Sequence, residues 1–250
     1  MDEFVSLCID IGNTNVKTAV FRGTQMDELL IMPTRTFNDA SKLLRKVKAN
    51  KIHGAILSNV SQQKTELVNQ LKAAIPLVIE LNFQTPLPIE IKYESPSTLG
   101  TDRIAAASAA WHKAGCRPSL AITCGTCIIY DYIDAKGNYL GGAISPGLRQ
   151  RLKVLHEQSA RLPWVEPQDA PAFPGKNTQQ SILAGVMRGI IHEIDGFVDE
   201  LKQSQPNLHV FLSGGDAHYF ATQLKNSIFA APNLIMEGLN QILLFNAKQS

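Results

Sequence analysis

The chain has 250 residues, 44% of them hydrophobic and 18% charged, with a formal net charge of +2 at pH 7. This length and composition predict a globular protein with one large domain or two small ones. Because the lysines and arginines are scattered, the charge pattern argues against nucleic acid and membrane partners.

The start of the chain favours a cytoplasmic location. Residues 1–10 begin with acidic side chains and lack the basic stretch and long apolar core of a secretory signal. No segment is an apolar run long enough to cross a bilayer. The four cysteines have no regular spacing, so we expect no disulfide framework, which suits a reducing compartment.

Two similar strand–turn–strand units are predicted about half a chain apart. The first has strands at 4–11 and 16–21 around a Gly-Asn-Thr-Asn turn, and the second has strands within 119–133 around Gly125 and Thr126. Their similarity suggests an internal duplication. Between them we predict four alternating elements, which indicate an α/β fold: a helix at 40–49, a strand at 54–60, a helix at 62–74 and a strand at 77–81.

The remaining elements follow a predicted break at 115–118. An alanine-rich helix at 103–114 precedes this break, and we place the domain boundary there, giving domains 1–117 and 118–250. Ser145 as N-cap and Pro146 at the first helical position predict another helix start. A turn at 136–138 precedes this helix start, and after it come a proline-rich loop at 163–177, a helix at 179–202, a strand at 208–212 and two further helices.

The first turn has the residues of a phosphate cradle. The sequence contains no G-x-x-x-x-G-K-[ST] motif and no G-x-G-x-x-G after a strand, so any phosphate site here uses another loop. In the first hairpin, Gly12 allows backbone N–H groups to approach an anion, Asn13 and Thr14 donate hydrogen bonds and Lys17 adds positive charge. Asp10 could hold Mg²⁺. The alternative is that these residues simply make a good turn.

A second candidate site lies at Asp102 and Arg103, where an irregular stretch gives way to the alanine-rich helix. The structural interpretation is a helix N-cap followed by a solvated arginine. The functional interpretation is that Asp102 accepts a hydroxyl proton and Arg103 binds a carboxylate or phosphate. An aspartate of ordinary pKa is basic enough, because the hydroxyl in phosphoryl transfer gives up its proton late.

Three further motifs have weaker signals. The C-x-x-C spacing at 124–127 suits zinc or redox chemistry, but there is no second pair and the motif lies between strands, so we interpret it as a second phosphate loop. Glycines at 141–147 precede a helix start that could receive an anion. Gly214 and Gly215 follow a strand and would let backbone approach a nucleoside.

Taken in order, these motifs resemble those of the type III pantothenate kinases, which belong to the acetate kinase, sugar kinase, Hsp70 and actin superfamily. The match spans nearly the whole chain and includes the following segments: Asp10–Lys17, Tyr93, Pro96, Gly100–Arg103, Gly125–Thr126, Gly141–Gly147, Asn177–Thr178, Ser213–Gly215 and Glu237–Asn240.

The resemblance implies both a fold and an activity. The fold would be α/β, with duplicated actin-like (ribonuclease H-like) domains, mixed sheets and ATP in the cleft between the domains, usually in a homodimer. The activity would be ATP-dependent phosphorylation of pantothenate to 4′-phosphopantothenate, the first step of coenzyme A biosynthesis. A catalytically inactive accessory protein of this fold, or another small-molecule kinase of the superfamily, are the alternatives.

The resemblance also assigns roles to residues. Asp102 would be the general base. The chain departs from the family pattern at a K⁺ or NH₄⁺ site, where the family usually has aspartate and this chain has Thr123. The pantothenate site would be lined by Tyr93, Gly100, Thr101, Asp102, Arg103 and Thr178. ATP, with Mg²⁺, would be held by Asp10, Ile11, Gly12, Asn13, Thr14, Asn15, Val16, Lys17, Thr126, Gly214 and Gly215.

Overall fold

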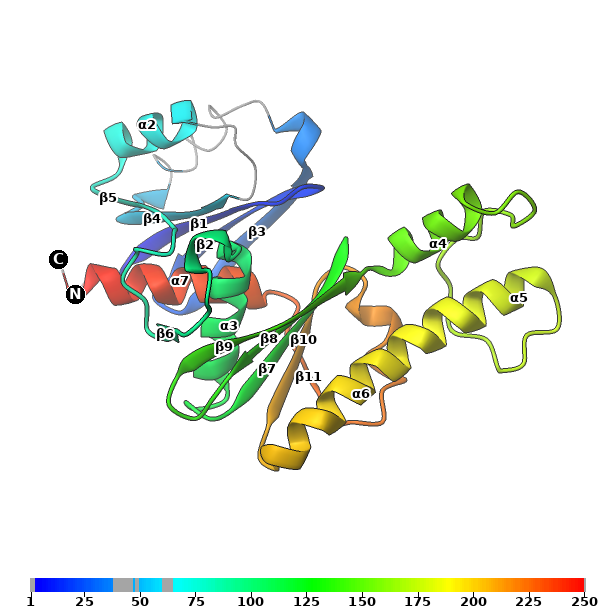
Figure 1. Cartoon of the computed structure of the whole chain (residues 1–250). Coiled ribbons are helices and arrows are strands. Elements are labelled where there is room, and N and C mark those ends of the chain that lie inside the picture. The colour runs from blue at the N-terminus through cyan, green and yellow to red at the C-terminus, as the bar shows by residue number, and fades with distance from the viewer. Residues whose placement is uncertain (1–2, 38–46, 48–49, 60–64, 250) are drawn as a thin grey trace.

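The computed structural model describes residues 3–37, 47, 50–59 and 65–249, which form two mixed β-sheets with helices between and outside them (Figure 1). No helix in these described parts is long and apolar enough to cross a membrane. The predicted helix at 40–49 and the ends of the elements predicted at 54–60 and 62–74 fall on residues outside this description.

The first sheet contains five strands. Strands β1, β2 and β3 form an antiparallel meander, and β4 and β5 continue the sheet in parallel with β1. In spatial order the strands are β3 (Gln25–Pro33), β2 (Asn15–Arg22), β1 (Val5–Ile11), β4 (Gly54–Asn59) and β5 (Leu77–Glu80).

The second sheet repeats this arrangement. Strands β7, β8 and β9 form the meander, and β10 and β11 extend it in parallel with β7. In spatial order the strands are β11 (Phe229–Ala230), β10 (His209–Ser213), β7 (Ser119–Cys124), β8 (Cys127–Ile133), β9 (Asn138–Pro146) and β6 (Glu90–Ile91). Five strands therefore have the same order in both sheets, which confirms the predicted duplication.

Helices form layers on both faces of each sheet. Helix α2 covers the outer face of the first sheet and α6 that of the second, while α3 and α7 share the core between the sheets. The helices are α2 (Thr65–Ala74), α3 (Thr101–Lys113), α4 (Leu148–Glu157), α5 (Thr178–Leu183), α6 (Gly189–Ser204) and α7 (Leu234–Ala247). A π-turn, Ala184–Arg188, joins α5 to α6, and 3-10 turns lie at Thr34–Thr36, Pro96–Thr98 and Ala217–Tyr219.

The two central helices each pack on the sheet of the opposite half. Helix α3 contacts β7, β8 and β10, whereas α7 contacts β1, β2 and β4. The crossing of α3 and α7 is close, because a Cβ added to Gly238 would lie 1.9 Å from the Ala105 carbonyl oxygen. The boundary expected at 117 falls between α3 and β7, and it stays a prediction.

Several features differ from the sequence-based expectations. The predicted helix start at Ser145 and Pro146 is wrong: β9 runs through both residues, which pair with Ile128 and Cys127, and α4 begins after Gly147. The Ser145 hydroxyl donates to Glu193 at 2.5 Å instead of capping a helix. The sequence did not predict strand β3. After β10 the structure has a 3-10 turn and α7, whereas the sequence predicted two helices.

Candidate active site

The tips of the two equivalent hairpins meet. The Thr14 hydroxyl in the turn after β1 lies 3.3 Å from the Thr126 hydroxyl in the turn after β7. The N–H of Gly147, just before α4, donates to the Thr126 carbonyl at 3.0 Å. Residues separated by more than a hundred positions therefore border one polar region between the two sheets.

The end of β3 braces the first tip. Thr34 donates its hydroxyl to the Gly12 carbonyl at 2.8 Å and its N–H to the Thr14 carbonyl at 2.9 Å. Within the turn, the Gly12 N–H donates to the Asn15 carbonyl at 3.0 Å, and a Cβ on Gly12 would come within 3.1 Å of the same oxygen. These bonds hold the loop in one shape and occupy its carbonyls, while Asn13 and Thr14 remain exposed.

Asp10 is a buried carboxylate at the end of β1. It is 6% exposed and lies in register between Lys17 on β2 and Ser58 on β4. Burial, followed by the charge of Asp102, raises its pKa to about 6, and the charge of Lys17 partly opposes this rise. Its Oδ1 atom has no hydrogen-bond partner in the described structure. Asp10, Lys17 and Asp102 are therefore close enough to form one cluster of charges.

The orphaned oxygen of Asp10 fits a magnesium ion. Mg²⁺ is usually held by one or two carboxylates together with substrate phosphates and water. The described residues contain no group of three or more His, Cys, Asp or Glu that could hold a metal by themselves. A single buried carboxylate beside a turn with exposed polar side chains suits a metal that is shared with a nucleotide.

Asp102 lies in the first turn of α3, beside this cluster. The N-cap of α3 is Gly100, and the Asp102 carboxylate accepts the N–H of Arg103 at 2.9 Å, so the interpretation of Asp102 as an N-cap is wrong. Burial raises the pKa of Asp102, although the hydrogen bond from Arg103 opposes the rise. The neighbouring Thr101 hydroxyl lies 2.9 Å from that of Ser58, which connects α3 to β4.

Arg103 is buried rather than solvated. Its Nε and Nη2 atoms both lie 2.8 Å from Oδ1 of Asp131 on β8. Its guanidinium carbon lies 5.8 Å from the Tyr93 ring centre and 5.9 Å from that of Tyr139. The expected ligand-binding arginine is thus already held by an acid and two aromatic rings.

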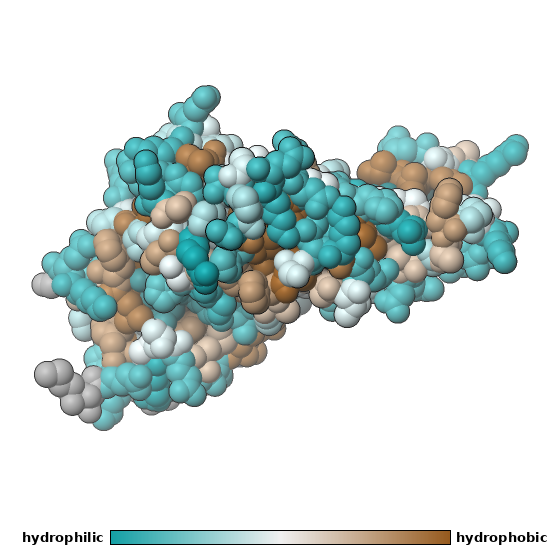
Figure 2. Space-filling model, turned by 90° about the horizontal axis from the view of Figure 1, so that it is seen from below, coloured by the Kyte–Doolittle hydropathy of each residue, from teal (hydrophilic) through white to brown (hydrophobic). Residues whose placement is uncertain are grey.

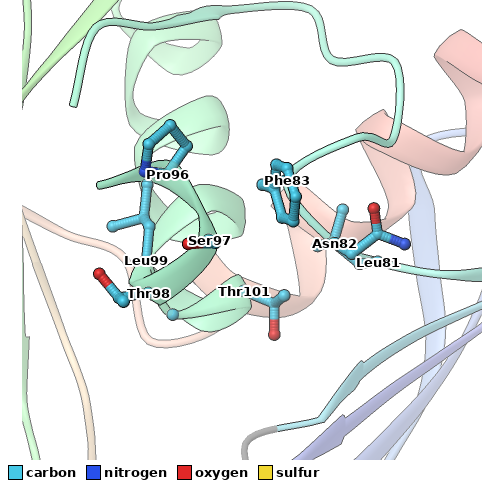
Figure 3. A pocket seen from close by; sticks show the side chains of 9 residues that line it. Leu81, Asn82, Phe83, Pro96, Ser97, Thr98, Leu99 and Thr101 are labelled. Atoms are coloured by element: carbon cyan, nitrogen blue, oxygen red, sulfur yellow. The ribbon is translucent and has the colours of Figure 1, made fainter. Parts of the chain in front are cut away.

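A pocket of about 470 Å³ opens at the start of α3. Figure 3 shows Phe83 on one side, the turn from Pro96 to Leu99 on the other, and Thr101 between them. Its lining is mixed, since Asn82 and the hydroxyls of the turn supply polar atoms. Gly100 and Thr101 line this pocket and adjoin Asp102, so a small molecule bound in it would lie beside the carboxylate.

Comparison with known proteins identifies the family. A model described as type III pantothenate kinase matches residues 6–200. The type III pantothenate kinase of Christiangramia forsetii is 41% identical over 245 residues, covering 98% of this chain and 100% of that protein. That of Bacteroides fragilis (strain YCH46) is 40% identical over 242 residues, covering 97% and 98%. The chain belongs to the type III pantothenate kinases.

Family membership confirms the predicted activity, which is ATP-dependent phosphorylation of pantothenate as the first step of coenzyme A biosynthesis. Solved structures support the fold. A Baf family protein from Campylobacter jejuni, 22% identical, has a TM-score of 0.63 over 97% of this chain and 99% of that one. The ROK hexokinase of Thermus thermophilus, 14% identical, has a TM-score of 0.54 over 98% and 100%.

The turn after β10 adjoins the second hairpin of the kinase. Gly214 has φ +97°, and a Cβ there would lie 2.1 Å from the Cys124 carbonyl oxygen. The Asp216 N–H donates to that carbonyl at 3.1 Å. Nothing lies within 4 Å of a Cβ built on Gly215, so that side of the turn is open. The position expected to contact the nucleoside therefore borders the Thr126 loop.

Of the remaining expected site residues of the kinase, Thr178 lies apart and Thr123 lies beside the second hairpin tip. Thr178 is exposed at the start of α5, in a part of the chain that projects from the second sheet away from α3 and β6 (Figure 1). Thr123 is half-buried in β7, opposite Ser213 on β10 and Ile129 on β8. A single chain of the kinase therefore does not bring Thr178 together with Tyr93 and Arg103.

Sequence reasoning missed Ser58 and Asp131. Both are polar residues inside apolar strands, and both are fully buried. Ser58 carries a usable signal, because a polar residue at the end of a parallel strand lies at the sheet edge where ligands bind. The signal at Asp131 is an acidic residue between two tyrosines in a buried strand. A buried carboxylate needs a buried partner, so this pattern predicts one.

Proposed function

We propose that Asp102 is the general base that accepts the proton of the pantothenate hydroxyl during transfer of the ATP γ-phosphoryl group. The observation that carries this proposal is the position of Asp102, next to Asp10 on one side and to the pocket at Gly100 and Thr101 on the other. A hydroxyl placed at Asp102 would thus lie between an acceptor pocket and the region bordered by the hairpin tips.

The ATP phosphates are proposed to bind at the two hairpin tips. The first tip offers backbone N–H groups and the Asn13 and Thr14 side chains, and Thr126 faces it from the second. Lys17 on β2 supplies positive charge next to Asp10. Asp10 would hold Mg²⁺, which when bound neutralises negative charge on the phosphates. The open turn at Gly215 is proposed to face the nucleoside.

Catalysis in this arrangement depends mainly on positioning. Phosphoryl transfer passes through a loose transition state, so the base must orient the hydroxyl and take its proton late. The bond from the Arg103 N–H fixes the Asp102 carboxylate at the beginning of α3. Burial that raises the pKa of Asp102 makes it a somewhat better proton acceptor than a solvated aspartate.

The test is Asp102→Asn in a coupled assay of ATP turnover with pantothenate. We expect kcat to fall about 10²- to 10⁴-fold, the range for loss of a general base, with nucleotide binding within about threefold of wild type. Asp195→Asn is the matched control, because Asp195 is a buried aspartate on α6 that accepts from Lys225 and Asn226.

Two outcomes would contradict the assignment. If Asp102→Asn kept more than about a third of wild-type kcat, Asp102 would not be the base. If the wild-type protein showed no pantothenate-dependent turnover, a non-catalytic accessory role would replace the assignment of Asp102 as a base.

We also propose that the enzyme acts as a homodimer and that Thr178 reaches the pantothenate site of the partner subunit. Within one chain Thr178 lies away from Tyr93 and Arg103. The projecting part that carries it also exposes apolar side chains, including Val154 at 56% and Phe173 at 77%. A second copy packed against this part would both cover the apolar surface and receive Thr178.

A further inference from the structure

The Asp131 carboxylate is the most deeply buried charge in contact with the candidate site. Asp131 is 1% exposed, and on β8 it lies opposite Ala121 and Gly142, which have little or no side chain. It belongs to the face of the sheet that packs against α3, where the surrounding residues are apolar. An ionised carboxylate in such surroundings is costly unless it is paired.

Its hydrogen bonds are concentrated on one oxygen. Oδ1 receives Nε and Nη2 of Arg103, each at 2.8 Å, and the Tyr139 hydroxyl, also at 2.8 Å. Oδ2 is buried and has no partner in the described structure. A pair optimised for stability would satisfy both oxygens, and apolar replacement of a buried ion pair is often neutral or stabilising. Stability alone therefore does not account for Asp131.

The arrangement fixes the plane of the Arg103 guanidinium. Asp131 takes the edge formed by Nε and Nη2, while Tyr93 and Tyr139 lie within 6 Å of the guanidinium carbon. The two rings are themselves in edge contact, with centres 6.0 Å apart. A guanidinium has further N–H groups on its opposite edge, which can form a planar fork to a carboxylate.

We infer that Asp131 is a positioning residue, with Tyr139, that orients Arg103 so that its remaining N–H groups recognise the carboxylate of pantothenate. This inference rests on the proposed function and on the expectation from the sequence that Arg103 lines the pantothenate site. Asp131 itself does not touch substrate. Its effect is on which end group the acceptor site prefers, and the reacting hydroxyl stays with Asp102.

The experiment compares pantothenate with panthenol, in which a hydroxymethyl group replaces the carboxylate and the acceptor hydroxyl is unchanged. For Asp131→Asn we expect kcat/KM for pantothenate to fall roughly 10- to 100-fold, mainly through KM, as for loss of a charge-assisted contact. The kcat/KM for panthenol should stay within about threefold of the wild-type value, so the preference for pantothenate over panthenol is largely lost. Asp195→Asn should leave the preference unchanged.

A double-mutant cycle separates positioning from general damage. If Asp131 acts through Arg103, adding Asp131→Asn to Arg103→Gln causes no further loss of preference. Tyr139→Phe, which removes one donor to Oδ1, should reduce the preference in the same direction but less, and it serves where Asp131→Asn fails to fold.

The inference is overturned if Asp131→Asn lowers kcat/KM equally for both substrates, or if the preference for pantothenate over panthenol is unchanged. It is also overturned if the effects of Asp131→Asn and Arg103→Gln on this preference are additive. A wild-type enzyme that does not distinguish the two substrates also overturns it. In that case ATP turnover with either substrate, and its loss in Asp102→Asn, would still support the proposed base.

Discussion

The Asp10 carboxyl group is buried next to the first hairpin tip, with one oxygen lacking a hydrogen-bond donor. Its pKa is raised from 3.8 to about 6, so the folded protein binds this proton more tightly than the unfolded chain does. The resulting stabilisation is fully present below pH 3.8 and is lost as the pH rises through about 6. At neutral pH, ionised Asp10 therefore destabilises the protein when no metal is bound.

Asp10→Asn should accordingly stabilise the enzyme and inactivate it. At pH 8, without nucleotide or metal, we expect the free energy of unfolding to rise by about 2 to 3 kcal/mol, because the buried charge is removed. The gain should shrink to about half at pH 5, where folded Asp10 is mostly protonated. Urea denaturation at the two pH values measures this. A loss of stability at pH 8, or an equal gain at both, would contradict the burial argument.

We expect Thr123 to weaken the response to monovalent cations. A neutral hydroxyl can coordinate K⁺ together with backbone carbonyls, but it does not supply the charge of a carboxylate. We expect wild-type turnover to change less than about threefold when K⁺ replaces tetramethylammonium, and Thr123→Asp to respond by about tenfold or more. Turnover in matched chloride salts measures both. A strict, steep K⁺ requirement in the wild type would contradict this prediction.

At the scale of elements, the crossing of α3 and α7 connects packing to catalysis. Helix α3 carries Asp102 in its first turn, and Gly238 on α7 lets the two helices approach closely. A methyl group at Gly238 would have to displace the backbone at Ala105, which would move α3 relative to the hairpin tips.

Gly238→Ala should therefore reduce both stability and turnover. Overpacking costs about 1 to 3 kcal/mol, and the shift of α3 should lower kcat more than the KM for ATP. The matched control is Gly196→Ala, in the exposed part of α6, where nothing lies within 4 Å of the added carbon. Helix propensity predicts that this control gains up to about 1 kcal/mol. Equal effects of the two substitutions on unfolding and turnover would refute the packing argument.

Helices, strands and turns could be predicted from the sequence where neighbouring residues alone determine the structure. The turns at Gly12 and Gly125 identified both central hairpins, because glycine and small polar residues favour tight turns. Ser145 was misassigned because its local signal is that of a cap, whereas the sheet pairs it with Ile128 and Glu193 takes its hydroxyl. The sequence predicted Arg103 as a site residue but could not identify its partner, because Asp131 comes from a strand in the other half.

For the whole molecule, duplication explains why the proposed site lies between two sheets. Each half contributes one hairpin tip, and each central helix packs on the sheet of the other half. The part that includes α4 and α5 has no counterpart among the described residues of the first sheet's layers, and it projects from the second sheet (Figure 1). Figure 2 shows apolar side chains on this end of the surface, which suits contact with a second copy.

A shared site predicts complementation between two inactive variants. Asp102→Asn removes the proposed base, and Thr178→Arg places a bulky side chain where the partner's pantothenate would bind. In a heterodimer of the two, one site keeps Asp102 from one subunit and Thr178 from the other. Co-expression should therefore restore about a quarter of wild-type turnover, since about half the dimers are mixed and each has one intact site. Light scattering reports the dimer independently, and a dimer whose mixed form stays inactive would mean that Thr178 does not complete its partner's site.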